Sequence, residues 1–177
     1  MSESSERYFA LFDKVYALLS DTTPRRYDCG ALCGARCCRN LACPDAVYQS
    51  GMALLPYEKE YLQSIGASDF LFRSGEDGDI LICRGRCRRA FRPFACRVFP
   101  YYARLSDEKT QIRPDIRAFQ VCPLLKGEKT GRMTPRFIRN YKKAVKLLST
   151  EPVIRADLQK TSDFIGSVYE LYSMFAE

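Results

Sequence analysis

The cysteines constrain this chain more strongly than any other feature of its sequence. It contains nine cysteines and no histidine. The stretch YDCGALCGARCC, which begins at residue 27, holds four of the cysteines, and CRGRCRRAFRPFAC, which begins at residue 83, holds three more. Adjacent Cα atoms lie ~3.8 Å apart, whereas disulfides want roughly 4.4–6.8 Å, so the neighbouring Cys37 and Cys38 are poorly placed to bridge each other. The fold therefore has to accommodate dense groups of sulfur atoms.

The N-terminal residues indicate that these thiols are reduced. The stretch MSESSERYFA is polar and acidic, without the basic start and apolar segment of a secretory signal peptide. No apolar run approaches the ~18 residues that a membrane span needs, so we expect a cytoplasmic protein with no membrane partner. In a reducing cytosol, clustered cysteines more often bind metal or carry out redox chemistry than form disulfides.

The absence of histidine narrows the chemistry further. It removes catalytic triads and cysteine–histidine pairs, which need an imidazole base, and it removes mixed cysteine–histidine zinc sites. Sites made only of thiolates are typical of zinc and of iron–sulfur clusters, and pairs spaced by two to four residues let both sulfurs reach one ion. The predicted metal ligands are Cys29, Cys33, Cys37, Cys38, Cys83, Cys87, Cys96 and Cys122.

The adjacent pair has a specific place in this prediction. In extended backbone, neighbouring side chains point to opposite sides of the chain. Cys37 and Cys38 then form a branch point. One thiolate joins Cys29 and Cys33, and the other reaches across to the second group of cysteines, which consists of Cys83, Cys87, Cys96 and Cys122.

Hydrophobic periodicity predicts helices around this cysteine-rich part. Apolar residues recur at helical spacing over residues 5–20. A first-turn proline at residue 56 and a glycine cap at residue 66 predict a short helix over residues 56–65, and a Thr-Pro start at residue 134 opens a further helix. A last helix or helix pair runs over residues 152–175, with an apolar face that faces inward. The expected inward residues of this last segment are Ile154, Leu158, Phe164, Ile165, Val168, Leu171, Tyr172 and Phe175.

The β-structure expected is small. Two apolar runs, residues 70–72 and 80–82, flank the turn sequence GEDGD and predict a hairpin that delivers Cys83 at its end. A second pair of short strands is also expected, over residues 97–105 and 111–119, across the turn sequence SDEK. The predicted fold class is mainly α with a small β-hairpin and an irregular cysteine-rich metal-binding core. Residues 1–177 form a single domain, with an N-terminal helix (5–20), a cysteine-rich region (27–125) and C-terminal helices (134–175).

The cysteine-rich region also resembles a known family. DCGALCGARCC, then MALLPYE, a C-x3-C pair, RPFACRVFP and VCPL are similar to the CxxCxxCC family, which is described as zinc- or iron-chelating and whose members are often labelled iron–sulfur cluster-containing domains. The resemblance implies that the eight cysteines named above are ligands. Cys43 lies outside that pattern and could be a ligand or a buried small residue. The gaps here are three residues long where the family name has two, so zinc and iron both stay open.

Three functions follow from these observations. We predict a metal-binding protein whose all-cysteine site or sites hold an iron–sulfur cluster or zinc. One alternative is an iron–sulfur-dependent redox or protein-modifying enzyme, since flagellin lysine methylases look similar in carrying such a domain on a longer chain. The other is a basic nucleic-acid-interacting protein with a structural metal. The sequence indicates neither catalytic residues nor a protein partner.

The nucleic-acid alternative rests on the net charge of +7 and on arginines beside the cysteines. Arginines also stabilise thiolates, and no recognisable nucleic-acid module accompanies the charge, so we do not expect nucleic acid as a partner. We expect Arg92 and Arg97 to have structural roles or to donate hydrogen bonds to sulfur. The acidic residues Glu58, Glu60 and Asp115 are expected to be solvated or salt-bridged rather than catalytic, with a ligand role for Asp115 as the lesser alternative.

Overall fold

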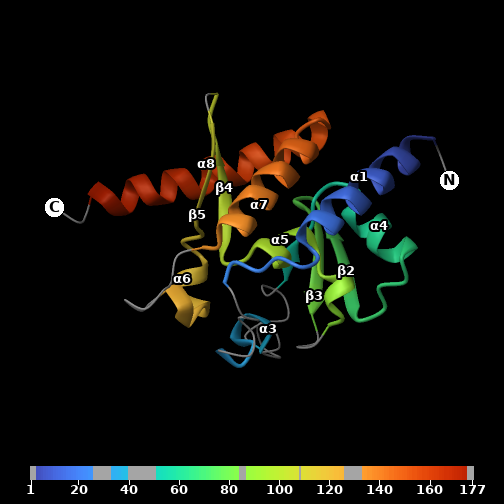
Figure 1. The fold of residues 1–177 in the computed structure, drawn as a ribbon, viewed down its shortest axis with the longest axis horizontal. Coiled ribbons are helices and arrows are strands. Elements are labelled where there is room, and N and C mark those ends of the chain that lie inside the picture. The colour runs from blue at the N-terminus through green and yellow to red at the C-terminus, as the bar shows by residue number, and fades with distance from the viewer. Residues whose placement is uncertain are drawn as a thin grey trace.

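A computed structural model describes residues 3–25, 33–39, 51–83, 87–107, 109–125 and 133–174, and the structural statements below concern these residues. Three long helices pack with two small antiparallel sheets and several short helical turns (Figure 1). The elements are α1 (Glu3–Leu19), α3 (Arg36–Arg39), β1 (Met52–Ala53), α4 (Glu58–Ser64), β2 (Phe70–Gly75), β3 (Gly78–Cys83), η3 (Arg89–Phe91), α5 (Phe94–Val98), β4 (Tyr101–Leu105), β5 (Thr110–Pro114), α6 (Ala118–Val121), η4 (Pro123–Leu125), α7 (Pro135–Leu148) and α8 (Pro152–Met174).

Helices α1 and α7 pack against each other and form much of the hydrophobic core. Phe12, Val15 and Leu19 of α1 are completely buried, as their helical spacing predicts. The Thr134 side chain caps α7 by accepting a hydrogen bond from the Phe137 backbone N–H at 3.2 Å, and a proline follows at the first helical position. The predicted helices over these two segments are confirmed, as is the short helix that became α4.

The predicted hairpin is confirmed, but the predicted fold class is wrong. Strands β2 and β3 pair from Phe70 opposite Cys83 to Gly75 opposite Gly78, and Gly78 has a φ of 112°, which favours glycine. However, β1 joins the other edge of β3, so this sheet has three strands, and β4 and β5 form a second sheet of two strands. One small hairpin does not describe this architecture.

The second pair of strands expected from the sequence is present as β4 and β5, whereas β1 was not predicted. Strand β1 has only two residues, too few for an alternating pattern. Tyr101, Tyr102 and Ala103 of β4 are all buried, so this strand has no alternation between a core face and a solvent face. Helix α8 packs against β4 and supplies part of that cover.

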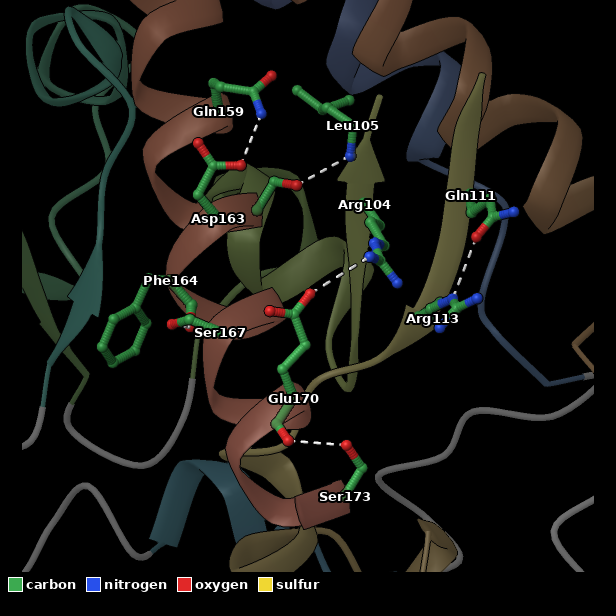
Figure 2. A network of polar contacts seen from close by, with 11 residues as sticks. Arg104, Leu105, Gln111, Arg113, Gln159, Asp163, Phe164, Ser167, Glu170 and Ser173 are labelled. Atoms are coloured by element: carbon green, nitrogen blue, oxygen red, sulfur yellow. Dashed lines mark hydrogen bonds and ion pairs between the residues drawn. The ribbon is translucent and has the colours of Figure 1, made fainter. Parts of the chain in front are cut away.

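Polar contacts fasten α8 to β4 (Figure 2). The Leu105 backbone N–H donates to the Ser162 hydroxyl at 2.9 Å, and the Arg104 guanidinium lies 3.9 Å from the Glu170 carboxylate. Further along, the Tyr169 hydroxyl donates to the Pro114 carbonyl of β5 at 3.0 Å. These contacts hold one side of α8 against the two-stranded sheet.

The prediction that the eight apolar residues named for this segment face inward is only partly right. Ile154, Leu158 and Ile165 are buried. Phe164, Leu171 and Tyr172 are instead 56%, 54% and 64% exposed, and Phe164 points away from β4 in Figure 2. The C-terminal part of α8 extends past the other elements in Figure 1, and Phe175 lies outside the described residues.

None of the helices in the described segments combines the length and the apolar character needed to cross a bilayer. The side chains of the main hydrophobic cluster come from α1, α4, both sheets, α5, α7 and α8. The assignment of residues 1–177 to a single domain stays a prediction.

Removal of the Thr134 cap tests whether this hydrogen bond stabilises α7. Thr134→Ala deletes the hydroxyl that accepts from the Phe137 N–H, so it should lower the free energy of unfolding by about 1 kcal/mol. Urea denaturation measures the change. Thr134→Ser keeps the hydroxyl and should stay within about 0.5 kcal/mol of the parent. Equal losses in both variants would show that the cap does not stabilise α7.

Candidate functional site

Five cysteines from four segments interact with one another, and we call them the thiol cluster. Cys83 is the buried last residue of β3, and Cys87 follows it at the start of the next described segment. Cys96 lies in the middle of α5. Cys37 and Cys38 lie in α3, which Figure 1 places below α5, toward the end of β3. All five are present as thiols rather than disulfides.

A chain of hydrogen bonds links four of these thiols. The Cys38 thiol bonds with both Cys37 and Cys83, and the Cys87 thiol bonds with Cys83. The hydrogen bond with Cys37 is the main cause that raises the pKa of Cys38 to about 11, and the bond with Cys83 opposes it. Side chains more than forty residues apart in the sequence are therefore in direct contact here.

Arg92 donates to this chain at Cys87. The hydrogen bond with Cys83 and burial raise the pKa of the Cys87 thiol, whereas the hydrogen bond from the Arg92 guanidinium lowers it. The expectation that Arg92 has a structural role or donates a hydrogen bond to sulfur is confirmed by this contact. A guanidinium in this position favours the thiolate form of Cys87.

Cys96 belongs to the cluster because it interacts electrostatically with three of the other thiols. Burial is the main cause that raises the pKa of its thiol, and the charges of Cys38, Cys87 and Cys83 raise it further. These electrostatic interactions require the four sulfurs to be near one another. Ionisation of several of them together is costly unless a cation compensates the charge.

The buried carboxylate of Glu58 holds α5, and hence Cys96, in place. Its Oε1 accepts hydrogen bonds from the Phe94 N–H at 2.5 Å and from the Tyr16 hydroxyl at 2.7 Å, and its Oε2 accepts from the Leu55 N–H at 3.0 Å. The residue is 0% exposed, and burial raises the pKa of this carboxyl. The expectation that Glu58 is solvated or salt-bridged is therefore wrong.

Arg97 holds the segment that precedes α5. Its Nε donates to the Arg92 carbonyl at 2.6 Å, and one terminal nitrogen donates to the Ala90 carbonyl at 2.7 Å. Its guanidinium carbon lies 3.9 Å from the centre of the Tyr16 ring. The structural role predicted for Arg97 is confirmed: it fixes the backbone that carries Arg92 toward Cys87.

Three arginines and one thiol share a small cavity beside the cluster. Arg89, Arg92, Arg97 and Cys96 contribute to the walls of a space of about 30 Å³. Arg89 is anchored there because its guanidinium donates to the backbone carbonyls of Ser20 and Thr22, just after α1, at 2.7 and 3.1 Å. One side of the thiol cluster therefore faces positive charge.

The other predicted ligands are placed as follows. Cys33 is partly exposed and precedes a turn in which Gly34 has a φ of 63°, and Cys122 is buried at the end of α6. Neither is among the five cysteines joined by the contacts above. Cys29 and Cys43 lie outside the described residues, as do Arg84 and Arg86. The extended backbone assumed for the branch point is also not observed, because Cys37 and Cys38 lie in the helical turn α3.

The donor set of the thiol cluster fits a thiophilic metal in its chemistry. It consists of five sulfur atoms with an arginine donor beside them, which suits zinc or iron–sulfur ligation. Within the described ranges, no group of three or more cysteine, aspartate or glutamate side chains is arranged so that it could hold a metal ion. A ligand role for Asp115 is not supported by its contacts, because Arg117 binds its carboxylate with a closest distance of 2.7 Å.

Glu58 is the residue of this site whose role sequence reasoning missed. The available signal was its position three residues after Leu55, where a first-turn carboxylate can reach back to an earlier N–H. The bond to Phe94 joins residues 36 positions apart, and no local pattern encodes it.

Comparison with known proteins assigns neither a family nor a function to this chain. The chain matches no protein-family model, no curated protein and no solved structure. The resemblance to the CxxCxxCC family stays a prediction from the motifs.

Replacement of the buried carboxylate tests whether it holds α5. Glu58→Gln puts an amide NH2 where one oxygen now accepts N–H or O–H donors, so the free energy of unfolding should fall by about 1–3 kcal/mol. Chemical denaturation measures this loss. The matched control is Glu60→Gln on the exposed face of α4, which should change stability by less than about 0.5 kcal/mol. Similar effects of the two changes would contradict the role given to Glu58.

The fork geometry of Arg97 gives a second test. Lysine keeps the charge of Arg97 but cannot bond both carbonyls and stack on Tyr16, so Arg97→Lys should cost about 2 kcal/mol in thermal or urea denaturation. Arg88→Lys is the control, because the Arg88 side chain is 62% exposed, and it should stay within about 0.5 kcal/mol. If Arg97→Lys left the stability unchanged, only the positive charge at this position would be needed.

Proposed function

We propose that this protein binds a thiophilic metal, zinc or an iron–sulfur cluster, through cysteine thiolates. One observation carries the proposal: five thiols from four segments are linked by hydrogen bonds and mutual electrostatic effects. In a chain without histidine, thiolate is the natural soft ligand for such a centre. The predicted ligand set remains the eight cysteines of the sequence analysis, and the thiol cluster contributes five of them.

The charges around the cluster support this proposal. Zinc with four thiolates, or an oxidised four-iron cluster with four thiolates, carries a net double negative charge. Arg89, Arg92 and Arg97 line the cavity beside Cys96 and would balance part of that charge. The hydrogen bond from Arg92 to Cys87 is of the kind that orients a metal-bound sulfur and stabilises its thiolate form.

The proposal includes a reducing location, the cytoplasm. Thiolate ligands are retained where cysteines stay reduced, and an oxidising compartment would favour disulfides between neighbouring thiols. The cysteines at the described positions are thiols, in keeping with such a location.

Anaerobic purification and elemental analysis test the proposal. The protein should contain zinc, or iron with acid-labile sulfide and a visible absorption band, in stoichiometric amounts. Elemental analysis also decides between the two metals. A folded, colourless, metal-free protein in which all nine cysteines react with a thiol reagent under native conditions would contradict the proposal.

Single substitutions in the cluster test which thiols hold the metal. Cys38→Ser and Cys83→Ser should each lower the metal content by at least about half, because they remove central members of the sulfur chain. Val98→Ala is the control: it destabilises α5 by removing buried methyl groups but leaves every thiol in place. Full metal content in both cysteine variants, or equal loss in the control, would contradict the assignment.

A further inference from the structure

Helix α7 presents an exposed face on which basic side chains predominate. The helix contains five basic residues and no acidic one, so it carries +5 of the net charge of +7. All five basic side chains are exposed. We call this surface the basic face of α7, and it consists of Arg136, Arg139, Lys142, Lys143 and Lys146.

The five cations lie on one side of the helix. At 3.6 residues per turn, they fall within an arc of about 120° around the helix axis. The buried residues of α7, which include Phe137, Tyr141 and Val145, occupy the opposite side. The hydrophobic core thus fixes the orientation of the helix and holds the basic face toward solvent.

Carboxylates do not neutralise this face within the described part of the chain. The ion pairs formed by the described residues do not involve any of the five cations. An open groove of about 510 Å³ between α1 and α7 continues the surface from Arg136 to Lys14, and Asp21 adds one carboxylate to its lining. Clustering of five like charges on one helix is unfavourable, and an anionic partner would offset this repulsion.

From this geometry we infer that the basic face of α7 binds the phosphate backbone of double-stranded nucleic acid. Along the helix, Arg136 and Lys146 are ten residues apart, which corresponds to about 15 Å. Measured along the duplex axis, the phosphates of one strand follow one another every ~3.4 Å, so a face of this length parallel to that axis spans about four of them. The contacts would be independent of base sequence, since guanidinium and ammonium groups on phosphates carry no sequence information.

The composition of the face favours a duplex over an anionic membrane or a single strand. An anionic membrane surface binds helices that insert an apolar face, but the apolar side of α7 is in the core. Single strands are bound through aromatic stacking platforms. The basic face includes no aromatic residue.

This surface differs from the one weighed in the sequence analysis. There, the candidate cations were the arginines beside the cysteines, and several of these face the thiol cluster and backbone carbonyls. The inference about α7 does not depend on whether the cysteines bind metal.

Fluorescence anisotropy with the full chain tests the inference. Labelled DNA and RNA duplexes of mixed sequence, about 20 base pairs long, are titrated between about 50 and 200 mM salt. The logarithm of the binding constant should fall with the logarithm of salt with a slope between about −3 and −4. Preference for the DNA or the RNA duplex identifies the source of the phosphates, and either result supports the inference.

A charge-reversal pair locates the binding surface. Arg139→Glu with Lys143→Glu should weaken binding at least about tenfold and reduce the salt slope by about 2. The control, Arg113→Glu with Lys109→Glu, makes the same charge change at exposed positions of the β4–β5 hairpin and should have a much smaller effect. If the reversed variant does not fold by circular dichroism, Arg139→Gln with Lys143→Gln replaces it.

Three results would overturn the inference. The first is that neither duplex binds at about 50 mM salt. The second is that the charge reversals in α7 and those in the control weaken binding equally. The third is that the protein binds vesicles of phosphatidylserine and neutral lipid but does not bind a duplex.

Discussion

The position of the thiols depends on one buried carboxylate. Glu58 accepts hydrogen bonds from the start of α5, from the segment before α4 and from Tyr16 of α1. A buried charge without partners costs several kcal/mol, so these three elements have to stay where their donors reach the carboxylate. Because α5 carries Cys96, the polar core of the protein also sets the geometry of the sulfur atoms.

Two arginines extend this control from the core to the thiols. The guanidinium of Arg97 lies over the Tyr16 ring and binds the carbonyls of residues 90 and 92. That backbone carries Arg92, whose side chain donates to Cys87. A continuous series of contacts therefore runs from the buried carboxylate, through an aromatic ring and two guanidinium groups, to the sulfur chain. The fold uses the charge of these arginines internally, whereas the charge of α7 is directed outward.

The success of sequence reasoning varied with how local each signal was. Helix α7 was predictable because its cap, its proline and its apolar stripe all lie within the helix itself. The exposed Phe164 and Leu171 of α8 were predicted to be inward, because periodicity identifies an apolar face but not whether another element covers it. The third strand of the first sheet was missed because β1 has two residues and depends on β3 for its hydrogen bonds.

The sequence by itself determined the chemistry that is available here: many thiols, no imidazole and an excess of basic side chains. It also determined the main helices, whose signals are encoded between near neighbours. The tertiary structure alone decided which thiols meet, which carboxylate is buried and which cations face solvent. Those outcomes arise from contacts between residues far apart in the chain, such as Cys38 with Cys83 and Glu58 with Phe94, and they form only when the packed core brings the segments together.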